Sequence, residues 1–242
     1  SDMSDEIPYT GDQFTFRIPV LDNMGISKVE VNYWYGEDTE MITDEMTFLD
    51  GLYIFTKIVR SDTVESLNYY FKAEDQKGNL NTSSTFGKLV ADNDRPDIRN
   101  YFLDGDPTTG EEYHLEFLIT DNIDVMSSYL EYWFNDGEHH NISMSLDGDH
   151  FYADIDIPNL IGNCNIIVSA VDTSGNWVSD PVFARTVMDN DLPEILSDRT
   201  PEMVEAGDQL TFEVDVADNV GIEKVELIYG FGFGETYTEE MS

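Results

Sequence analysis

The chain has 242 residues, of which 50 are Asp or Glu and 12 are Lys or Arg, so its formal net charge is −38. A surface this acidic repels phosphate backbones and anionic lipid head groups, which excludes nucleic acids as partners. No run approaches the roughly 18 consecutive apolar residues that a membrane span needs, so no direct membrane insertion is expected. With 40% hydrophobic and 12% aromatic residues, the chain is too apolar for an acidic disordered tail and is expected to fold.

The sequence repeats itself with a period near 97 residues, and such a period defines the unit that folds. Each copy opens with Thr-Gly or Ala-Gly and then alternates apolar and polar residues up to an Asp-Asn pair. The first landmark, at the start of each copy, is Thr10-Gly11, Thr109-Gly110 and Ala206-Gly207. The second, at the end of each alternating run, is Asp22-Asn23, Asp121-Asn122 and Asp218-Asn219. A third landmark, Asp92-Asn93-Asp94 before Pro96, recurs 97 residues later as Asp189-Asn190-Asp191 before Pro193.

These offsets predict three modules. They span residues 4–91, which lack most of a leading strand, residues 92–188, and residues 189–242, a truncated third copy. Half a sandwich exposes a core face and unpaired edges. We therefore expect residues 194–242 to be poorly ordered or to be completed by another chain, and a fully protected third module in solution would contradict this.

Within each copy, apolar residues recur at every second position, which predicts strands with one buried face. These runs lie at 14–20, 29–35 and 67–73, at 115–119, 130–134 and 164–170, and at 210–216 and 225–229. Asp50-Gly51 and Asp147-Gly148 are typical of hairpin turns. Six or seven short strands per hundred residues, with no helical period, indicate an all-β fold of two-sheet antiparallel β-sandwiches.

The run Tyr69-x-Phe71-x-Ala73-x-Asp75-x-x-Gly78-Asn79, followed by a strand and the acidic Asp92 to Pro96 junction, resembles the tandem immunoglobulin-like repeats of bacterial and archaeal secreted and cell-surface proteins. The junction is also similar to the calcium-binding linkers of cadherins, although those place one more residue before the proline. The resemblance implies tandem immunoglobulin-like sandwiches at the cell surface or outside the cell, in a stalk, an adhesin or a surface-layer protein. Other surface proteins or glycans are the partners that it implies.

Acidic and amide side chains gather at the junctions between modules. In a seven-strand sandwich, the entering linker and the loops after the second and sixth strands lie at one end. Like charges brought together there need a cation, and calcium takes six to eight oxygen ligands. The predicted metal ligands are Asp92, Asn93, Asp94, Asp121, Asn122, Asp124, Asp172 and Asn176 at the first junction, and Asp189, Asn190, Asp191, Asp218 and Asn219 at the second.

The acidic and amide residues also fit two alternatives to calcium binding. Asp and Asn are common in turns because their side chains cap nearby backbone amides, and Asp-x-x-Gly-Asn makes a good turn without any ion. A highly acidic surface also keeps a protein soluble in salt, so a saline habitat is a second cause for the charge.

Catalysis has little support, and we expect no enzyme here. No nucleophile elbow, phosphate loop or His-Glu-x-x-His helix occurs, and the four histidines all lie in the second copy. Cys164 has no partner for a disulfide and suits a buried apolar position. Trp34 and Trp133 share one strand position, where neighbouring strands would cover them. The alternative is that they contact glycans, as accessory modules of a secreted polysaccharide-acting enzyme.

Overall fold

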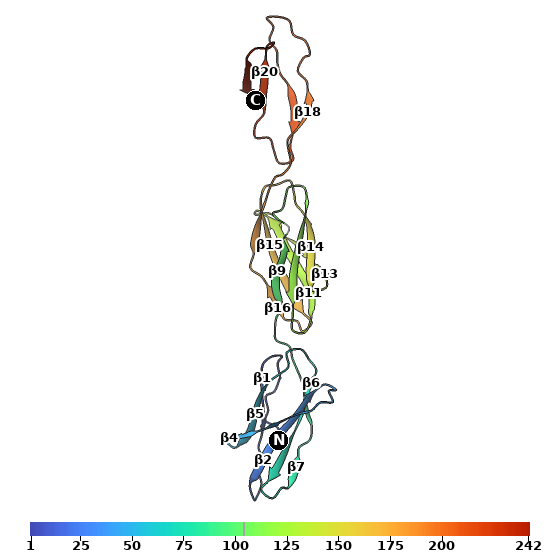
Figure 1. The fold of residues 1–242 in the computed structure, drawn as a ribbon, viewed down its shortest axis with the longest axis vertical. Helices are drawn as coiled ribbons and strands as arrows, with labels where there is room; N and C mark the ends of the chain where they lie inside the picture. Colours follow the sequence, from blue (N-terminus) through green and yellow to red (C-terminus); the bar gives the residue numbers. More distant parts are fainter. Residues whose placement is uncertain (104) are drawn as a thin grey trace. The chain divides into compact units, whose positions relative to one another are not determined.

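The computed structural model describes residues 1–103 and 105–242, and for residues 100–103 it describes the backbone only. All regular elements in these residues are β-strands, and the strands within each sheet pair antiparallel (Figure 1). The predicted all-β fold with antiparallel sheets is therefore confirmed. Among the described residues no helix is long and apolar enough to cross a membrane.

The first copy forms two sheets that face each other. One sheet has the order β1 (Gln13–Ile18), β5 (Leu52–Ile58), β4 (Thr47–Leu49), and the other β3 (Ile42–Glu45), β2 (Ile26–Tyr35), β6 (Ser66–Asp75), β7 (Leu80–Thr82), with β8 (Phe86–Leu89) also paired to β6. Phe16, Tyr33 and Tyr69 are fully buried between the sheets, and the Phe16 ring lies 5.0 Å from Tyr69 and 5.5 Å from Tyr33. The alternation read from the sequence thus places its apolar residues in this core.

The segment before β1 takes part in the first sheet. The backbone amides of Met3 and Asp5 donate to the carbonyls of Arg17 and Thr15, both at 3.0 Å. Further on, Tyr9 forms a parallel bridge with Ala91. This short segment therefore pairs with β1 in the position of a leading strand.

The second copy repeats the arrangement with a complete leading strand. One sheet has the strand order β13 (Ser145–Asp147), β14 (His150–Asp156), β10 (Glu112–Thr120), β9 (Asp97–Leu103). The other has the order β12 (His140–Ser143), β11 (Val125–Phe134), β15 (Gly162–Asp172), β16 (Trp177–Ser179), and β17 (Phe183–Val187) also pairs with β15. The first, second, fifth and sixth strands of this copy form one sheet, and the remaining strands form the other. This order is that of immunoglobulin-like and fibronectin-like sandwiches, so the tandem immunoglobulin-like fold is established by topology.

The third copy holds four strands in two separate pairs. They are β18 (Glu194–Asp198) with β19 (Val214–Ala217), and β20 (Glu226–Gly230) with β21 (Thr236–Glu240). None of residues 188–242 is buried. An apolar cavity of about 570 Å³, lined by Ile195, Val216 and Leu227 among others, lies where the other copies have a core. Poor order of residues 194–242, or their completion by another chain, stays a prediction.

The contacts divide the chain into two compact units. The first comprises Ser1–Arg99, Ile119–Ser128 and Ser169–Ser179, and the second comprises Asn100–Leu118, Tyr129–Val168 and Asp180–Ser242. Two loops of the second repeat, 119–128 and 169–179, thus belong to the same compact unit as the first repeat. The repeat boundaries themselves stay a prediction.

Candidate metal centre

The linker after the first repeat is held by a buried hydroxyl. Thr10, 1% exposed, donates from Oγ1 to Asp92 Oδ1 at 2.8 Å, and the backbone amide of Asp94 donates to the same oxygen at 3.2 Å. Asp92 is itself only 9% exposed. Its second oxygen, Oδ2, is buried and has no hydrogen-bond donor.

Asp121 begins the turn between β10 and β11. Its Oδ1 accepts the backbone amides of Ile123 at 3.0 Å and Asp124 at 3.2 Å, so the carboxylate caps its own turn. Its Oδ2 is buried without a donor. One oxygen thus shapes the loop, and the other is left for a different role.

Asp172 lies at the end of β15 and is fully buried. Its Oδ1 accepts the amides of Ser174 and Asn176, both at 2.8 Å, and its Oδ2 accepts the side-chain amide of Asn176 at 2.7 Å. Asp75 makes the same pattern with Asn79 in the first repeat. The interpretation of this Asp as a cap of its own turn is therefore confirmed, since the same hydrogen bonds form in both copies.

These three carboxylates converge. One oxygen from each of Asp92, Asp121 and Asp172 lies within 4.8 Å of the other two, the single such group of His, Cys, Asp or Glu in the described part of the chain. Over the same residues, no Lys, Arg or His forms an ion pair with any of them. We call these three residues the acidic cluster.

The acidic cluster is electrostatically unfavourable as it stands. Burial raises the pKa of Asp121, and the charges of Asp92 and Asp172 add to that effect, although amide hydrogen bonds oppose it. Burial acts in the same direction on Asp92, but hydrogen bonds from Thr10 and from the Asp94 amide outweigh it and hold the pKa of Asp92 below its usual value. The two carboxylates thus differ because Asp92 has more donors and Asp121 feels more negative charge.

Asn122 adds an amide oxygen to the acidic cluster's surroundings. Its Nδ2 donates to the carbonyl of Ser61 at 2.8 Å and to Asp92 Oδ1 at 3.3 Å, which fixes the orientation of the amide. Its Oδ1 is buried without a donor. Three oxygens, from Asp92, Asp121 and Asn122, are therefore buried and unpaired, which is costly unless something positive faces them.

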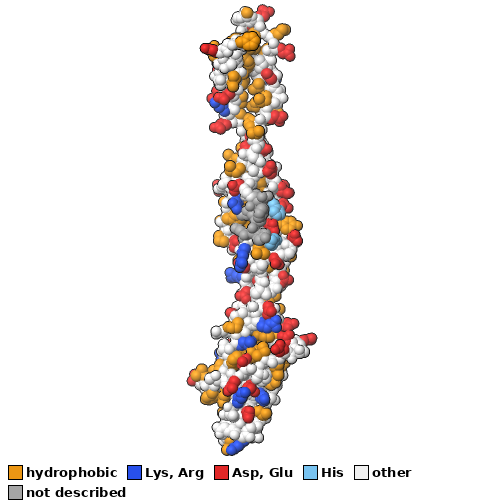
Figure 2. Space-filling model, viewed as in Figure 1, with side chains coloured by type: hydrophobic (Ala, Val, Ile, Leu, Met, Phe, Trp, Pro, Cys, Tyr) orange, Lys and Arg blue, Asp and Glu red, His pale blue; other side chains and the backbone are white. Residues whose placement is uncertain are grey.

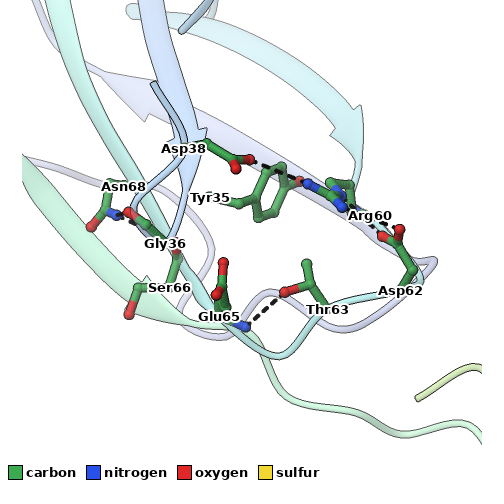
Figure 3. A network of polar contacts seen from close by, with 9 residues as sticks. All are labelled: Tyr35, Gly36, Asp38, Arg60, Asp62, Thr63, Glu65, Ser66 and Asn68. Atoms are coloured by element: carbon green, nitrogen blue, oxygen red, sulfur yellow. Dashed lines mark hydrogen bonds and ion pairs between the residues drawn. The ribbon is translucent and has the colours of Figure 1, made fainter. Parts of the chain in front are cut away.

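A polar network fixes the loop that carries Ser61 (Figure 3). Arg60 donates from Nε and Nη2 to both oxygens of Asp62, at 2.9 and 3.1 Å, and from Nη1 to Asp38 at 3.2 Å. Its guanidinium lies over the Tyr35 ring, 5.5 Å from the centroid, and its backbone amide donates to the Tyr35 hydroxyl at 3.2 Å. These contacts of Arg60 therefore hold the loop that carries the Ser61 carbonyl in place.

The oxygen chemistry fits calcium better than zinc. The donors that face one another are carboxylate and amide oxygens, which suit hard cations such as calcium, whereas zinc prefers nitrogen and sulfur ligands. The three unpaired oxygens and the charge of three carboxylates are what a divalent cation would satisfy. The residues that would hold it are Asp92, Asp121, Asn122 and Asp172.

The rest of the predicted ligands of the first junction have different contacts. Asn93 donates to Asp12 at 3.0 Å, Asp94 accepts from Thr10 at 3.0 Å, and Asn176 donates to the backbone carbonyl of Asp92 at 3.2 Å. The Asp124 side chain is exposed, and its backbone carbonyl accepts the amide of Thr173.

Sequence reasoning did not assign a role to Thr10 or Ser61. A signal existed for Thr10, because Thr-Gly recurs as Thr109-Gly110 before the second junction. Ser61 contributes only a carbonyl, which any residue has, so no sequence pattern points to it.

The second junction repeats part of this geometry. Thr109 donates to Asp189 Oδ1 at 3.1 Å, and the Asp191 amide donates to the same oxygen at 3.1 Å, as Thr10 and Asp94 do at Asp92. Asn219 donates to Thr109 at 3.0 Å and also to Asp191, and its Oδ1 is buried without a donor. Asp191 and Asn219 line a cavity of about 350 Å³.

The remaining predicted ligands of the second junction cap or contact their own surroundings. Asp218 accepts the amides of Val220 and Gly221, and Asn190 donates to Glu111 at 3.5 Å.

The aromatic candidates are partly covered by neighbours. Trp34 makes an edge contact with Tyr70 at 6.3 Å, and Trp133 stacks on His139 at 4.0 Å with the rings 7° from parallel. Cys164 is fully buried, and burial raises its thiol pKa to about 11. A buried thiol of this kind acts as a small apolar side chain.

No protein-family model matches this sequence, and no curated protein is detectably similar to it. Solved structures with a similar arrangement include an ICAM-5 D1–D4 ectodomain fragment, 13% identical over 100% of this chain and 67% of its own, with a TM-score of 0.49. A tetra-tandem repeat from the extending region of a large adhesion protein is 16% identical over 96% of this chain and 70% of its own, with a TM-score of 0.39.

Fibronectin(III)-like modules of Clostridium thermocellum CbhA are 16% identical over 77% of this chain and 93% of their own, with a TM-score of 0.28. Because every one of these TM-scores is below 0.5, the fold assignment rests on the strand order and not on these likenesses.

Proposed function

We propose that this chain is a non-enzymatic series of immunoglobulin-like modules, 4–91, 92–188 and 189–242, in a protein of the cell surface or the extracellular space. Its role is structural, as part of a stalk, an adhesin or a surface-layer protein, with other surface proteins or glycans as partners. The observation that carries the proposal is the acidic cluster, because the residues that build it come from a linker and from two loops of the next repeat.

The first junction binds one calcium ion through Asp92, Asp121, Asn122 and Asp172. A bound cation neutralises the repulsion among the three carboxylates and takes up the buried oxygens that have no donor. Because Asp92 belongs to the linker while Asp121 and Asp172 belong to loops, the ion restrains the linker against the loops. A flexible chain of modules thereby becomes stiffer when calcium is present.

The second junction binds calcium as well, through Asp189, Asn190, Asp191, Asp218 and Asn219. It shares the Thr109–Asp189 contact with the first junction and also has an unpaired amide oxygen, that of Asn219.

Calorimetric titration of the whole chain with calcium tests this function. The unmodified chain and Asp75→Asn bind calcium at the first junction with equal affinity, because Asp75 caps the equivalent loop without belonging to the acidic cluster. Asp121→Asn loses at least tenfold in affinity. Equal binding by Asp121→Asn and Asp75→Asn, or no binding by the unmodified chain, contradicts the proposal.

A saline habitat as the cause of the acidity predicts a different response. Stability would then rise with sodium chloride as strongly as with calcium at the same ionic strength, since screening does not depend on ion type. A calcium site predicts stabilisation at calcium concentrations far below those at which sodium acts.

Glycan binding through Trp34 and Trp133 has less support. Both indole rings contact neighbouring aromatic side chains, and Trp133 lies flat against His139. A sugar would have to displace His139 before it could stack on that face of Trp133.

A further inference from the structure

A group of histidine and carboxylate side chains lies on the outer face of the sheet β13-β14-β10-β9. On β10 the buried residues Leu115 and Phe117 alternate with His114 and Glu116, which therefore face outward. On β14 the buried residues Phe151, Ala153 and Ile155 alternate with outward-facing residues. Those residues are His150, Tyr152, Asp154 and Asp156.

The strand register brings the outward-facing residues together. His114 lies directly opposite Asp154, and Glu116 lies opposite Tyr152. His150 is therefore diagonal to Glu116, two residues along β14 from Tyr152, which is within reach of a long side chain. Figure 2 shows histidine side chains at the surface beside acidic ones.

The hydrogen bonds orient the ring of His114. Its Nδ1 lies 2.6 Å from Asp154 Oδ1. An ionised carboxylate only accepts hydrogen bonds, so Nδ1 donates to Asp154, and this leaves Nε2 as the ring nitrogen that can bind a metal ion. That Nε2 lies 3.9 Å from Glu116 Oε2. In metal sites, a histidine ligand commonly donates one ring N–H to a carboxylate, which orients its other ring nitrogen toward the metal.

Glu116 is oriented from its other side. Its Oε1 accepts a hydrogen bond from Nδ1 of His150, so Oε2 is turned toward His114. The side chains of Glu116 and His150 are 24% and 29% exposed, which leaves the site open to solvent ions. Two imidazoles and two carboxylates thus form one connected group.

We propose that His114, Glu116 and His150 bind one divalent transition-metal ion of the zinc class, with Asp154 orienting His114. Zinc bonds of about 2.0–2.1 Å place two ligands about 3.3 Å apart in a tetrahedron, so the present 3.9 Å between His114 Nε2 and Glu116 Oε2 needs to shorten by about half an ångström. The ligand atoms of these three residues do not all lie within 4.8 Å of one another, so His150 completes the set only when its ring turns from the hydrogen bond toward the ion. Water fills the fourth position.

The site is a property of this copy and not of the fold. With the offsets of 99 and 97 residues, the first repeat has Thr15, Arg17 and Tyr53 where the second has His114, Glu116 and His150. Arg17 there pairs with Asp5 instead. The imidazole ligands also separate this site from the acidic cluster, which offers oxygen alone.

The remaining two histidines of the chain provide a matched control. His139 stacks on Trp133 and bonds to Glu131 at 2.6 Å, and His140 lies on β12 beside Tyr132. They belong to the other sheet and share no contact with Glu116. The variant H139A/H140A removes as many imidazoles as H114A/H150A does.

The test is a calorimetric titration of the whole chain with zinc chloride, with excess calcium present so that the first junction does not compete. One zinc ion binds to the unmodified chain and to H139A/H140A with the same affinity, while H114A/H150A and Glu116→Gln each lose at least tenfold. Equal loss in H139A/H140A, or no zinc binding by the unmodified chain, overturns the proposal.

Two further measurements keep folding and calcium separate from zinc. Circular dichroism shows whether H114A/H150A stays folded, and nitrogen shifts of the His114 and His150 rings on zinc addition report ligation in the unmodified chain without any substitution. Unchanged ring shifts overturn the proposal. Asp121→Asn binds zinc as the unmodified chain does, so a failure at the acidic cluster leaves this site standing.

Discussion

Asp121→Asn should have opposite effects on stability without calcium and with it. Asparagine keeps an Oδ1 that can accept the amides of Ile123 and Asp124, so the turn is preserved. What the substitution removes is one charge that lies within 4.8 Å of Asp92 and Asp172. The perturbation therefore isolates the electrostatics of the acidic cluster from its turn geometry.

The size of the effect follows from Coulomb's law. At 4.8 Å, one pair of like charges costs about 0.9 kcal/mol in water and about 3.5 kcal/mol at an effective dielectric constant of about 20. Asp121 is partly exposed, so its repulsion lies between these limits. We expect the variant to be more stable than the unmodified chain by about 1–3 kcal/mol when calcium is removed by a chelator.

Saturating calcium should reverse this order. An ion at about 100 times its dissociation constant stabilises the folded state by about 2.7 kcal/mol, and the variant forgoes most of that gain. Urea unfolding with and without calcium, monitored by tryptophan fluorescence, measures both differences. A variant that is equal to or less stable than the unmodified chain under both conditions refutes the reasoning, because that is what a turn without an ion predicts.

Three further predictions concern single contacts. Thr10→Val removes the shortest of the three hydrogen bonds to Asp92 Oδ1 and is expected to cost about 1.5–3 kcal/mol in urea unfolding, the range for a hydrogen bond to a charged group; a Thr10→Ser variant that is equally destabilised would contradict the role of the hydroxyl. Cys164, with its pKa raised to about 11, should not react with a thiol reagent at pH 8 until the chain unfolds, and rapid labelling of the native chain would disprove its burial. Burial acts to raise the pKa of Asp5, but the hydrogen bonds from Arg17 and Thr15 outweigh it and lower the pKa. The stability from this contact is therefore full above pH about 4 and is lost as the pH falls through the lowered pKa, and acid unfolding of Asp5→Asn should lack this component.

The repeats and the alternation of apolar residues were sufficient to predict the fold. Phe16 and Leu115 occupy the same place in the two copies, and both are buried, because a strand has a period of two and only one face meets the core. The Asp-Gly turn at Asp50 joins β4 to β5 with positive φ at both residues, as the dipeptide predicts. The local turn and strand preferences favour the same structure as the packing of the core, so these elements could be predicted from the sequence.

The acidic cluster could be predicted only in part. Asp92, Asp121 and Asp172 were expected to meet because linker and loops share one end of a sandwich, and they do. Which oxygens remain unpaired depends on tertiary donors such as the hydroxyl of Thr10 and the carbonyl of Ser61, which no local pattern reveals. Asn93 and Asp124 are the same residue types as these ligands, but Asn93 donates to Asp12 and the Asp124 side chain is exposed, so their part in the site stays a prediction.

The His114–Glu116–His150 group was not apparent from the sequence for a related reason. The residues are separated by up to 36 positions in the chain, and only the register between β10 and β14 brings them together. Alternation predicts which residues face outward on one strand, but the partner across the sheet depends on how the two strands are aligned.

A crystal structure of the chain grown with calcium tests the central claim most directly. We predict an anomalous density peak about 2.3–2.6 Å from Asp92 Oδ2, Asp121 Oδ2 and Asn122 Oδ1. Density for water alone at that position, or carboxylates turned away from one another into solvent, would show that these loops meet without a metal ion.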